Sequence, residues 1–289
     1  MEALNVKKAG AAAGRAVRYF VLAFGSLVTL YPLIFMCLVG FFTKEEYWAT
    51  ELSLFPIPTQ PTIENYLALL DRSRTGDVLI PFLNTLAVTV TQVAVTVVTV
   101  LFCAYAFTRL RWRGQNAVFF VLLATSMLPS TMSLIPTYIL YGQFGILDSY
   151  LVYFIGMPAI NIMGTYITMQ YFRSVPTALD EAARIDGANV MQIMWRVLFP
   201  VAKPIFGYII ITTAIGTWNN WQTSFFYTES TSLRTLPAVL SSVSLSTGGI
   251  PDYPFMITLG LLITIPTLIV YLVFQKYIVL GLASAGIKE

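Results

Sequence analysis

Long apolar runs alternate with short polar segments along this chain of 289 residues. A helix needs about 20 predominantly apolar residues to cross a bilayer. Six runs reach that length, near 19–42, 81–106, 117–140, 150–172, 204–227 and 254–277. The fourth and fifth contain polar or small residues, which are tolerated where a helix packs on protein or faces a water-filled path. The pattern predicts an all-α polytopic membrane protein with six transmembrane helices, in which residues 1–18 precede a single transmembrane domain over residues 19–289.

The amino-acid composition also indicates that lipid surrounds most of the protein's surface. Apolar residues make up 57% of the chain and charged residues only 11%, against about 25% charged in an average soluble domain. The chain has no histidine, and Cys37 and Cys103 each lie inside an apolar run. Zinc sites and His-based catalytic triads need residues that are missing here. We therefore expect no metal site, no cofactor and no enzymatic activity in this chain.

Basic residues are distributed unevenly between alternate loops, and this predicts the orientation. With the N-terminus in the cytoplasm, thirteen of the 17 Lys and Arg residues face the cytoplasm. Cytoplasmic loops of membrane proteins carry such an excess of positive charge. Residues 1–18, 107–116 and 173–203 are then cytoplasmic, and both chain termini lie on the cytoplasmic side.

The cytoplasmic segment 173–203 is amphipathic, unlike the rest of the chain. Thr177 with Asp180 three residues later predicts the capped start of a helix over about 178–186. Gly187 suits the left-handed residue that ends such a helix. This first helix presents a compact surface of small and charged side chains.

A second helix is expected after a bend in the same segment. Asn189 with Gln192 predicts its start, and Pro200 predicts its end after Phe199. Two short helices joined by a glycine bend suit a knob that fits a groove on another protein. The alternative is that both helices lie at the membrane interface, as amphipathic helices often do.

The string EAARIDGANVMQIMWRVLFP, residues 181–200, resembles the EAA motif of ABC importer permeases. Other stretches are similar to the MalG-like branch of carbohydrate permeases along nearly the whole chain. These are TLYPLIFMCLVGFFT, FLNTLAVTV, YAFTRLRWRG, GTWNNWQTSFFY, RTLPAVL and the tail QKYIVLGLASAGIKE. One departure is the WNNW sequence at 218–221, where many relatives have Trp-Asn-Asp-Phe.

The resemblance implies a transmembrane permease of an ATP-driven importer for oligosaccharide in the bacterial cytoplasmic (inner) membrane. Expected partners are a second, MalF-like permease subunit, two ATPase subunits that bind ATP and Mg, and an extracytoplasmic solute-binding protein. The EAA loop, 173–203, would dock on an ATPase as a coupling helix. The residues that carry this coupling role are Glu181, Ala182, Ala183, Asp186 and Gly187. Consistently, the chain has no G-x-x-x-x-G-K-[ST] phosphate-binding loop of its own.

Polar residues inside the apolar runs are candidates for a substrate pathway, because they are costly in lipid unless they have partners or a function. The candidates are Asn161, Tyr166, Trp218, Asn219 and Asn220. Asn84 and Gln92 are also polar, but helix–helix hydrogen bonds would account for them. Tryptophan near the outer boundary is likewise ordinary at a membrane interface.

Other transport classes remain open at this stage. An ABC permease for another solute class, such as glycerol-phosphate or an amino acid, would share the same motif. A secondary transporter would carry internal repeats or mid-span carboxylates. All 14 acidic residues fall in loops or terminal segments, so that class is less favoured. Whether the sugar is neutral or acidic stays open.

Overall fold

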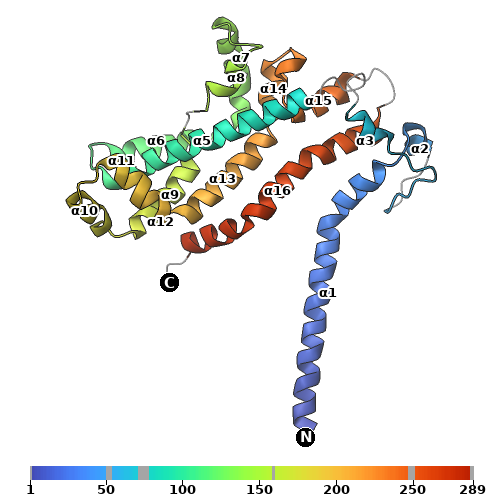
Figure 1. Ribbon diagram of the computed structural model, residues 1–289, viewed down its shortest axis with the longest axis horizontal. Helices are drawn as coiled ribbons and strands as arrows, with labels where there is room; N and C mark the ends of the chain where they lie inside the picture. The colour runs from blue at the N-terminus through green and yellow to red at the C-terminus, as the bar shows by residue number, and fades with distance from the viewer. Residues whose placement is uncertain (1, 50–53, 71–77, 158–159, 247–250, 287–289) are drawn as a thin grey trace. The chain divides into compact units, whose positions relative to one another are not determined.

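The computed structural model describes residues 2–49, 54–70, 78–157, 160–246 and 251–286 (Figure 1). Regular structure in these ranges is helical throughout, as the sequence predicts for an all-α protein. The chain forms two compact units. Unit 1 contains residues 1–74 and 247–262, and unit 2 contains residues 75–246 and 263–289.

Unit 1 is built around helix α1, Glu2–Val39, and the first residues of α16, Tyr253–Gly286. The apolar part of α1, Gly14–Val39, contains an 18-residue stretch of which 0% is buried within the structure. The short helices α2, Lys44–Ala49, and α3, Glu64–Ala68, follow it. Asn65 on α3 donates from Nδ2 to the carbonyls of Gly40 and Phe42, at 2.9 and 2.7 Å. These two bonds hold α3 against the end of α1.

Unit 2 is organised by helix α5, Leu79–Arg109, which packs along α9, Ile162–Ser174, and α13, Lys203–Trp218 (Figure 1). Their shared core includes the fully buried residues Leu101, Phe172, Leu198, Ile205 and Ile209. Some threonine hydroxyls inside these helices bond backward to carbonyls four residues earlier, as Thr168 does to Gly164 at 2.8 Å. This is the usual way in which an apolar helix keeps hydroxyls satisfied.

Three helices are long and apolar enough to span a membrane by themselves: Gly14–Val39, Leu79–Arg109 and Tyr253–Lys276. Two further candidates are bent pairs. They are Gln115–Ser126 with Ser130–Gln143, bent by 86°, and Val190–Val201 with Lys203–Trp218, bent by 85°. The described helices therefore supply three to five spans, and the predicted count of six is not confirmed.

The expected span 117–140 is broken in the structure. Helix α6, Gln115–Ser126, ends before Pro129, and η1, Ser130–Ser133, leads into α7, Leu134–Gln143. Pro129 has ψ 128°, outside the helical region. A proline also disfavours helical conformation in the residue before it, and this explains the break.

The expected spans 150–172 and 204–227 are divided as well. The first consists of α8, Leu151–Phe154, and α9, with Pro158 outside the described residues. In the second, α13 ends at Trp218 and a separate helix α14, Gln222–Tyr227, follows. Two further helices follow α14: η3, Thr231–Leu233, and α15, Leu236–Ser246.

Candidate functional site

The EAA segment folds into two short helices joined by a bend, as predicted. Its first helix, α10, runs Ala178–Ile185. The expected side-chain cap from Thr177 is wrong, since this residue has helical angles and its side chain caps nothing. The carbonyl of Thr177 instead accepts the amides of Asp180 and Glu181, at 2.9 and 3.0 Å. The chain after Pro176 therefore enters the helix through backbone hydrogen bonds alone.

The bend after α10 depends on Gly187, which has φ +83°. The amide of Gly187 donates to the carbonyl of Arg184 at 3.0 Å, and the amide of Ala188 donates to that of Ala183 at 2.9 Å. These two bonds form a Schellman motif, which closes a helix through a left-handed residue. The glycine predicted to bend the loop is thus the residue whose backbone makes the bend possible.

The second helix begins as the sequence predicts. Asn189 and Gln192 form a reciprocal capping box, with both side chain–backbone distances at 2.9 Å. Helix α11, Val190–Gln192, continues as the π-helical segment η2, Ile193–Leu198, and then as α12, Phe199–Val201. The prediction that Pro200 closes the helix after Phe199 is wrong by two residues. A proline ring clashes with the carbonyl four residues earlier, and the wider π turn before it relieves that clash.

Helical spacing divides α10 into two faces. Asp180 and Ala183 face inward; Asp180 is 5% exposed, and Ala183 packs against the core of unit 2. Glu181, Ala182 and Ile185 lie on the opposite side and are exposed. We call these three residues the docking face. Asp186 and Gly187 are exposed at the end of the helix.

Ile185, whose exposed fraction is 87%, is not among the coupling residues predicted from the sequence. Among the described residues it is the most exposed large apolar side chain, and it extends the surface formed by Glu181 and Ala182. The signal was available, because Ile185 lies four residues after Glu181, on the same helical face.

Arg109 joins the end of α5 to the start of the EAA helices. Its Nε lies 2.8 Å from Oδ2 of Asp180, and both side chains are 7% exposed. Its Nη2 donates to the carbonyl of Val175 at 2.9 Å. The guanidinium therefore lies within the turn that connects α9 to α10.

Three of the predicted pathway residues, Asn161, Tyr166 and Asn219, make contacts with neighbouring groups of unit 2. Asn161 caps α9 and accepts the amide of Gly164 at 2.8 Å. Tyr166 stacks on Phe119, with ring centroids 6.2 Å apart, and is 40% exposed. The side chain of Asn219 donates back to the carbonyl of Ile215 at 2.9 Å.

Trp218 is packed into the interior of unit 2. Its side chain is buried, and Nε1 donates to the carbonyl of Ile263 at 3.0 Å. Phe82 packs edge-on against it, with centroids 5.6 Å apart. Beside it lies an apolar groove of about 400 Å³ between α5, α13 and α16.

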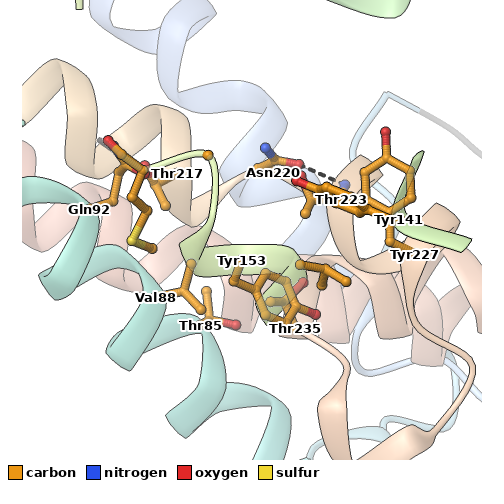
Figure 2. A pocket seen from close by; sticks show the side chains of 13 residues that line it. Thr85, Val88, Gln92, Tyr141, Tyr153, Thr217, Asn220, Thr223, Tyr227 and Thr235 are labelled. Atoms are coloured by element: carbon orange, nitrogen blue, oxygen red, sulfur yellow. Dashed lines mark hydrogen bonds between the residues drawn. The ribbon is translucent and has the colours of Figure 1, made fainter. Parts of the chain in front are cut away.

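Asn220, the fifth candidate, lines a polar cavity of about 230 Å³ in unit 2 (Figure 2). The lining is Thr85, Val88, Gln92, Tyr141, Val152, Tyr153, Gly156, Met157, Thr217, Asn220, Thr223, Tyr227 and Thr235. Hydroxyls, amides and aromatic rings dominate it, and no acidic or basic side chain is among these described residues. Figure 2 shows Gln92 and Thr217 on one side, and Tyr141 and Tyr227 on the other.

Hydrogen bonds hold the tyrosines of this cavity in place. Tyr153 donates to the carbonyl of Leu233 at 2.7 Å, and Tyr227 donates to that of Leu134 at 3.2 Å. Thr235 is 4% exposed, and its hydroxyl has no hydrogen-bond partner among the described residues. Most of this lining escaped the sequence analysis, because threonine and tyrosine scattered through apolar runs give no local pattern.

Asn84, in contrast, is structural, as expected. Its Nδ2 donates to the carbonyls of Ser232 and Arg234, at 2.8 and 3.1 Å, and Oδ1 accepts the hydroxyl of Tyr150 at 3.1 Å. It therefore ties α5 to the segment that follows α14.

The chain was compared with known proteins. Residues 96–283 match the family described as "Binding-protein-dependent transport system inner membrane component". The chain is 27% identical to the galactooligosaccharides transport system permease protein GanQ of Bacillus subtilis, over 93% of this chain and 94% of its relative. It is also 27% identical to the sn-glycerol-3-phosphate transport system permease protein UgpE of Yersinia pestis, over 92% of this chain and 95% of that protein.

A solved structure has the same fold. It is a bacterial ABC transporter involved in the import of the acidic polysaccharide alginate, which aligns over 92% of this chain and 96% of the matched chain. The TM-score is 0.75 and the sequence identity 24%. The family match covers well over half of the sequence and confirms the resemblance that its motifs suggest. The chain belongs to the binding-protein-dependent transport system inner membrane components.

Proposed function

We propose that this chain forms one half of the translocation pathway of an ATP-driven oligosaccharide importer and docks on an ATPase through its EAA loop. The exposed docking face of α10, with Ile185 87% uncovered, is the observation that carries the docking proposal. Glu181 would pair with a basic group or a backbone amide of the ATPase. Ala182 and the half-buried Ala183 would allow close approach, and Asp186 and Gly187 would lie at the edge of the contact.

The remaining partners follow from the same proposal. A second, MalF-like permease completes the pathway, two ATPase subunits bind ATP and Mg, and an extracytoplasmic solute-binding protein delivers the sugar. ATP binding closes the ATPase pair, and the docked loops carry that movement to the spans. The permease then alternates between inward-open and outward-open states, each favoured by the ligands that bind it better.

The proposed topology has six spans in the cytoplasmic membrane, with both termini in the cytoplasm. Three continuous helices, the bent pair α6–α7, and α13 with α14 would supply five of these spans. Helices α8 and α9 would together form the sixth, from the predicted run 150–172. This topology puts the docking face in the cytoplasm and the polar cavity in the outer half of the bundle, near the start of α5 and the end of α13.

We propose the polar cavity as the place where this subunit contacts one sugar ring. Its volume of about 230 Å³ is small beside the ~300–1,000 Å³ of drug-sized ligand sites, and it therefore suits a single ring. The unpartnered hydroxyl of Thr235 and the side-chain NH2 of Asn220 would bond sugar hydroxyls, while Oδ1 of Asn220 accepts the amide of Thr223 at 3.1 Å. Tyr141 and Tyr227 offer aromatic faces. Because the lining is uncharged, a neutral ring fits it better than a uronate.

The other pathway candidates have narrower proposed roles. Tyr166 and Asn219 are exposed on unit 2 and remain candidates for the part of the pathway that the second permease completes. Asn161 and Trp218 are occupied by local hydrogen bonds and would shape the pathway through α9 and α13.

A permease for another solute class is the second candidate function. The similarity to UgpE favours glycerol-phosphate as its substrate, and an amino acid permease or a secondary transporter is less supported. A phosphate would need basic partners, and the described lining of the cavity has none. This distinction can be tested directly.

The test is transport by the complete complex in proteoliposomes. Neutral oligosaccharides, uronate oligomers and glycerol 3-phosphate are each supplied with their binding proteins. We expect ATP-dependent uptake of a neutral oligosaccharide. Uptake of glycerol 3-phosphate or a uronate oligomer alone would contradict the proposed substrate, and uptake without any ATPase would contradict the ABC mechanism.

A further inference from the structure

The pair Arg109–Asp180 is buried on the cytoplasmic side of unit 2 yet incompletely satisfied. The two side chains approach to 2.8 Å, between Nε of Arg109 and Oδ2 of Asp180. The other oxygen, Oδ1, has no hydrogen-bond partner among the described residues. Removing two charges from water is costly, and apolar residues of similar size often stabilise a protein as well as or better than a buried pair. Its geometry therefore suits orientation better than net stability.

The two residues stand at a junction between elements. Arg109 is the last residue of the 31-residue helix α5. Asp180 lies in the first turn of α10, on the face opposite Glu181, Ala182 and Ile185. Arg109 also binds the carbonyl of Val175, the residue that ends α9. The Arg109 guanidinium thus links α10, the helix that carries the docking face, to the ends of α5 and α9.

Helix α5 leads from this junction to the polar cavity. Thr85, Val88 and Gln92 of α5 line the cavity. At 1.5 Å per residue, Thr85 and Arg109 are separated by about 36 Å along the helix. A movement of α10 can reach the cavity along α5 only if α10 is held firmly to the end of that helix.

We propose that Arg109 and Asp180 are positioning residues that hold the docking helix on α5, so that displacement of α10 by the ATPase is passed to the cavity-lining helix. The transport part of this proposal rests on the proposed function. The attachment part does not, because it concerns contacts within this chain alone.

The variants are Arg109→Gln, Asp180→Asn and the exchange Arg109→Asp with Asp180→Arg. The matched control is Arg173→Gln, which removes an exposed arginine in the last turn of α9. In reconstituted complexes we expect the single variants to assemble and hydrolyse ATP. Sugar moved per ATP should fall about tenfold, within the range of coupling between linked sites. The exchange should recover most of this loss, and the control should behave as the parent protein.

A second measurement needs no partner subunit. Trypsin cleaves after the exposed Arg184 in α10, and cleavage of a helix requires its local opening. For the isolated chain we expect faster cleavage there in both single variants, and parental rates in the exchange and the control. A merely stabilising pair would change folding yield but not the ratio of sugar to ATP.

Two results would overturn the proposal. Single variants with parental coupling and parental cleavage would show that the pair positions nothing. Loss of assembly that the exchange does not repair would assign the pair to folding alone. Should the parent complex transport none of the offered solutes, the proposed function fails, while the cleavage rates still decide whether the pair holds α10.

Discussion

At the level of single residues, the conformation of the EAA loop depends on the backbone as much as on side chains. Gly187 has φ +83°, and no heavy atom lies within 4 Å of the position where a Cβ would be added. Space therefore does not select glycine here. The left-handed conformation does, because it forces the Cβ of any other residue toward a carbonyl oxygen.

Gly187→Ala should destabilise the bend by about 1 kcal/mol, the cost of the left-handed conformation for a residue with a Cβ. Since α10 and α11 would then lose their relative orientation, the ATPase should bind about fivefold more weakly. Affinity of the detergent-solubilised permease pair for the ATPase measures this. Gly216→Ala in α13 is the control, because Gly216 also has open space for a Cβ but no left-handed backbone. Equal affinity of both variants would show that the bend needs no glycine.

At the scale of elements, local signals were readable from the sequence and contacts between distant segments were not. The capping box at Asn189 and the bend at Gly187 involve neighbours in sequence, and both predictions are confirmed. The predicted side-chain cap at Thr177 is wrong because backbone hydrogen bonds already satisfy the start of α10, and the threonine hydroxyl makes no capping bond. The break at Pro129 was not predicted because the apolar run continues across it. Hydrophobicity alone does not indicate where the backbone leaves the helical conformation.

The turn before α8 shows how an element boundary can depend on pH. Asp148 has φ 53°, and its carboxylate accepts the hydroxyl of Ser230 at 2.6 Å and the amides of Ser230 and Glu229 at 2.8 and 2.9 Å. These hydrogen bonds, the Ser230 hydroxyl first, lower the pKa of Asp148 from its ordinary 3.8. The turn before α8 is thereby held to the segment that follows α14.

The link at Asp148 should weaken in acid. Its folded pKa is lowered, so its stabilising effect is full above the ordinary pKa and is lost as the pH falls through the folded value. We expect the amides of Glu229 and Ser230 to lose protection from hydrogen exchange below about pH 4. In Asp148→Asn the protection should be weak at every pH. Glu229→Gln, which removes a neighbouring carboxylate, is the control and should keep the parental profile; an unchanged profile in Asp148→Asn would exclude the link.

At the scale of the whole molecule, helix α5 connects chemistry that lies far apart in the sequence. Its beginning lines the cavity with residues from α7, α8, α13 and α14, and Arg109 at its end pairs with Asp180 of α10. The helix itself could be predicted from its apolar run. The cavity could not, because Tyr141, Tyr153, Asn220 and Thr235 come together only when four segments pack, and each alone reads as an ordinary residue of a membrane helix or loop.

Sugar contact and force transmission should therefore be separable by mutation. Thr235→Val removes the unpartnered hydroxyl in the cavity with little change of shape. We expect the sugar concentration for half-maximal uptake to rise about fivefold, the effect of one net hydrogen bond, while sugar moved per ATP stays parental. Thr213→Val is matched, since that hydroxyl is also buried and unpartnered among the described residues but does not line the cavity. If Thr235→Val instead lowers the ratio of sugar to ATP, or if Thr213→Val has the same effect on half-maximal uptake, the cavity is not where the sugar is bound.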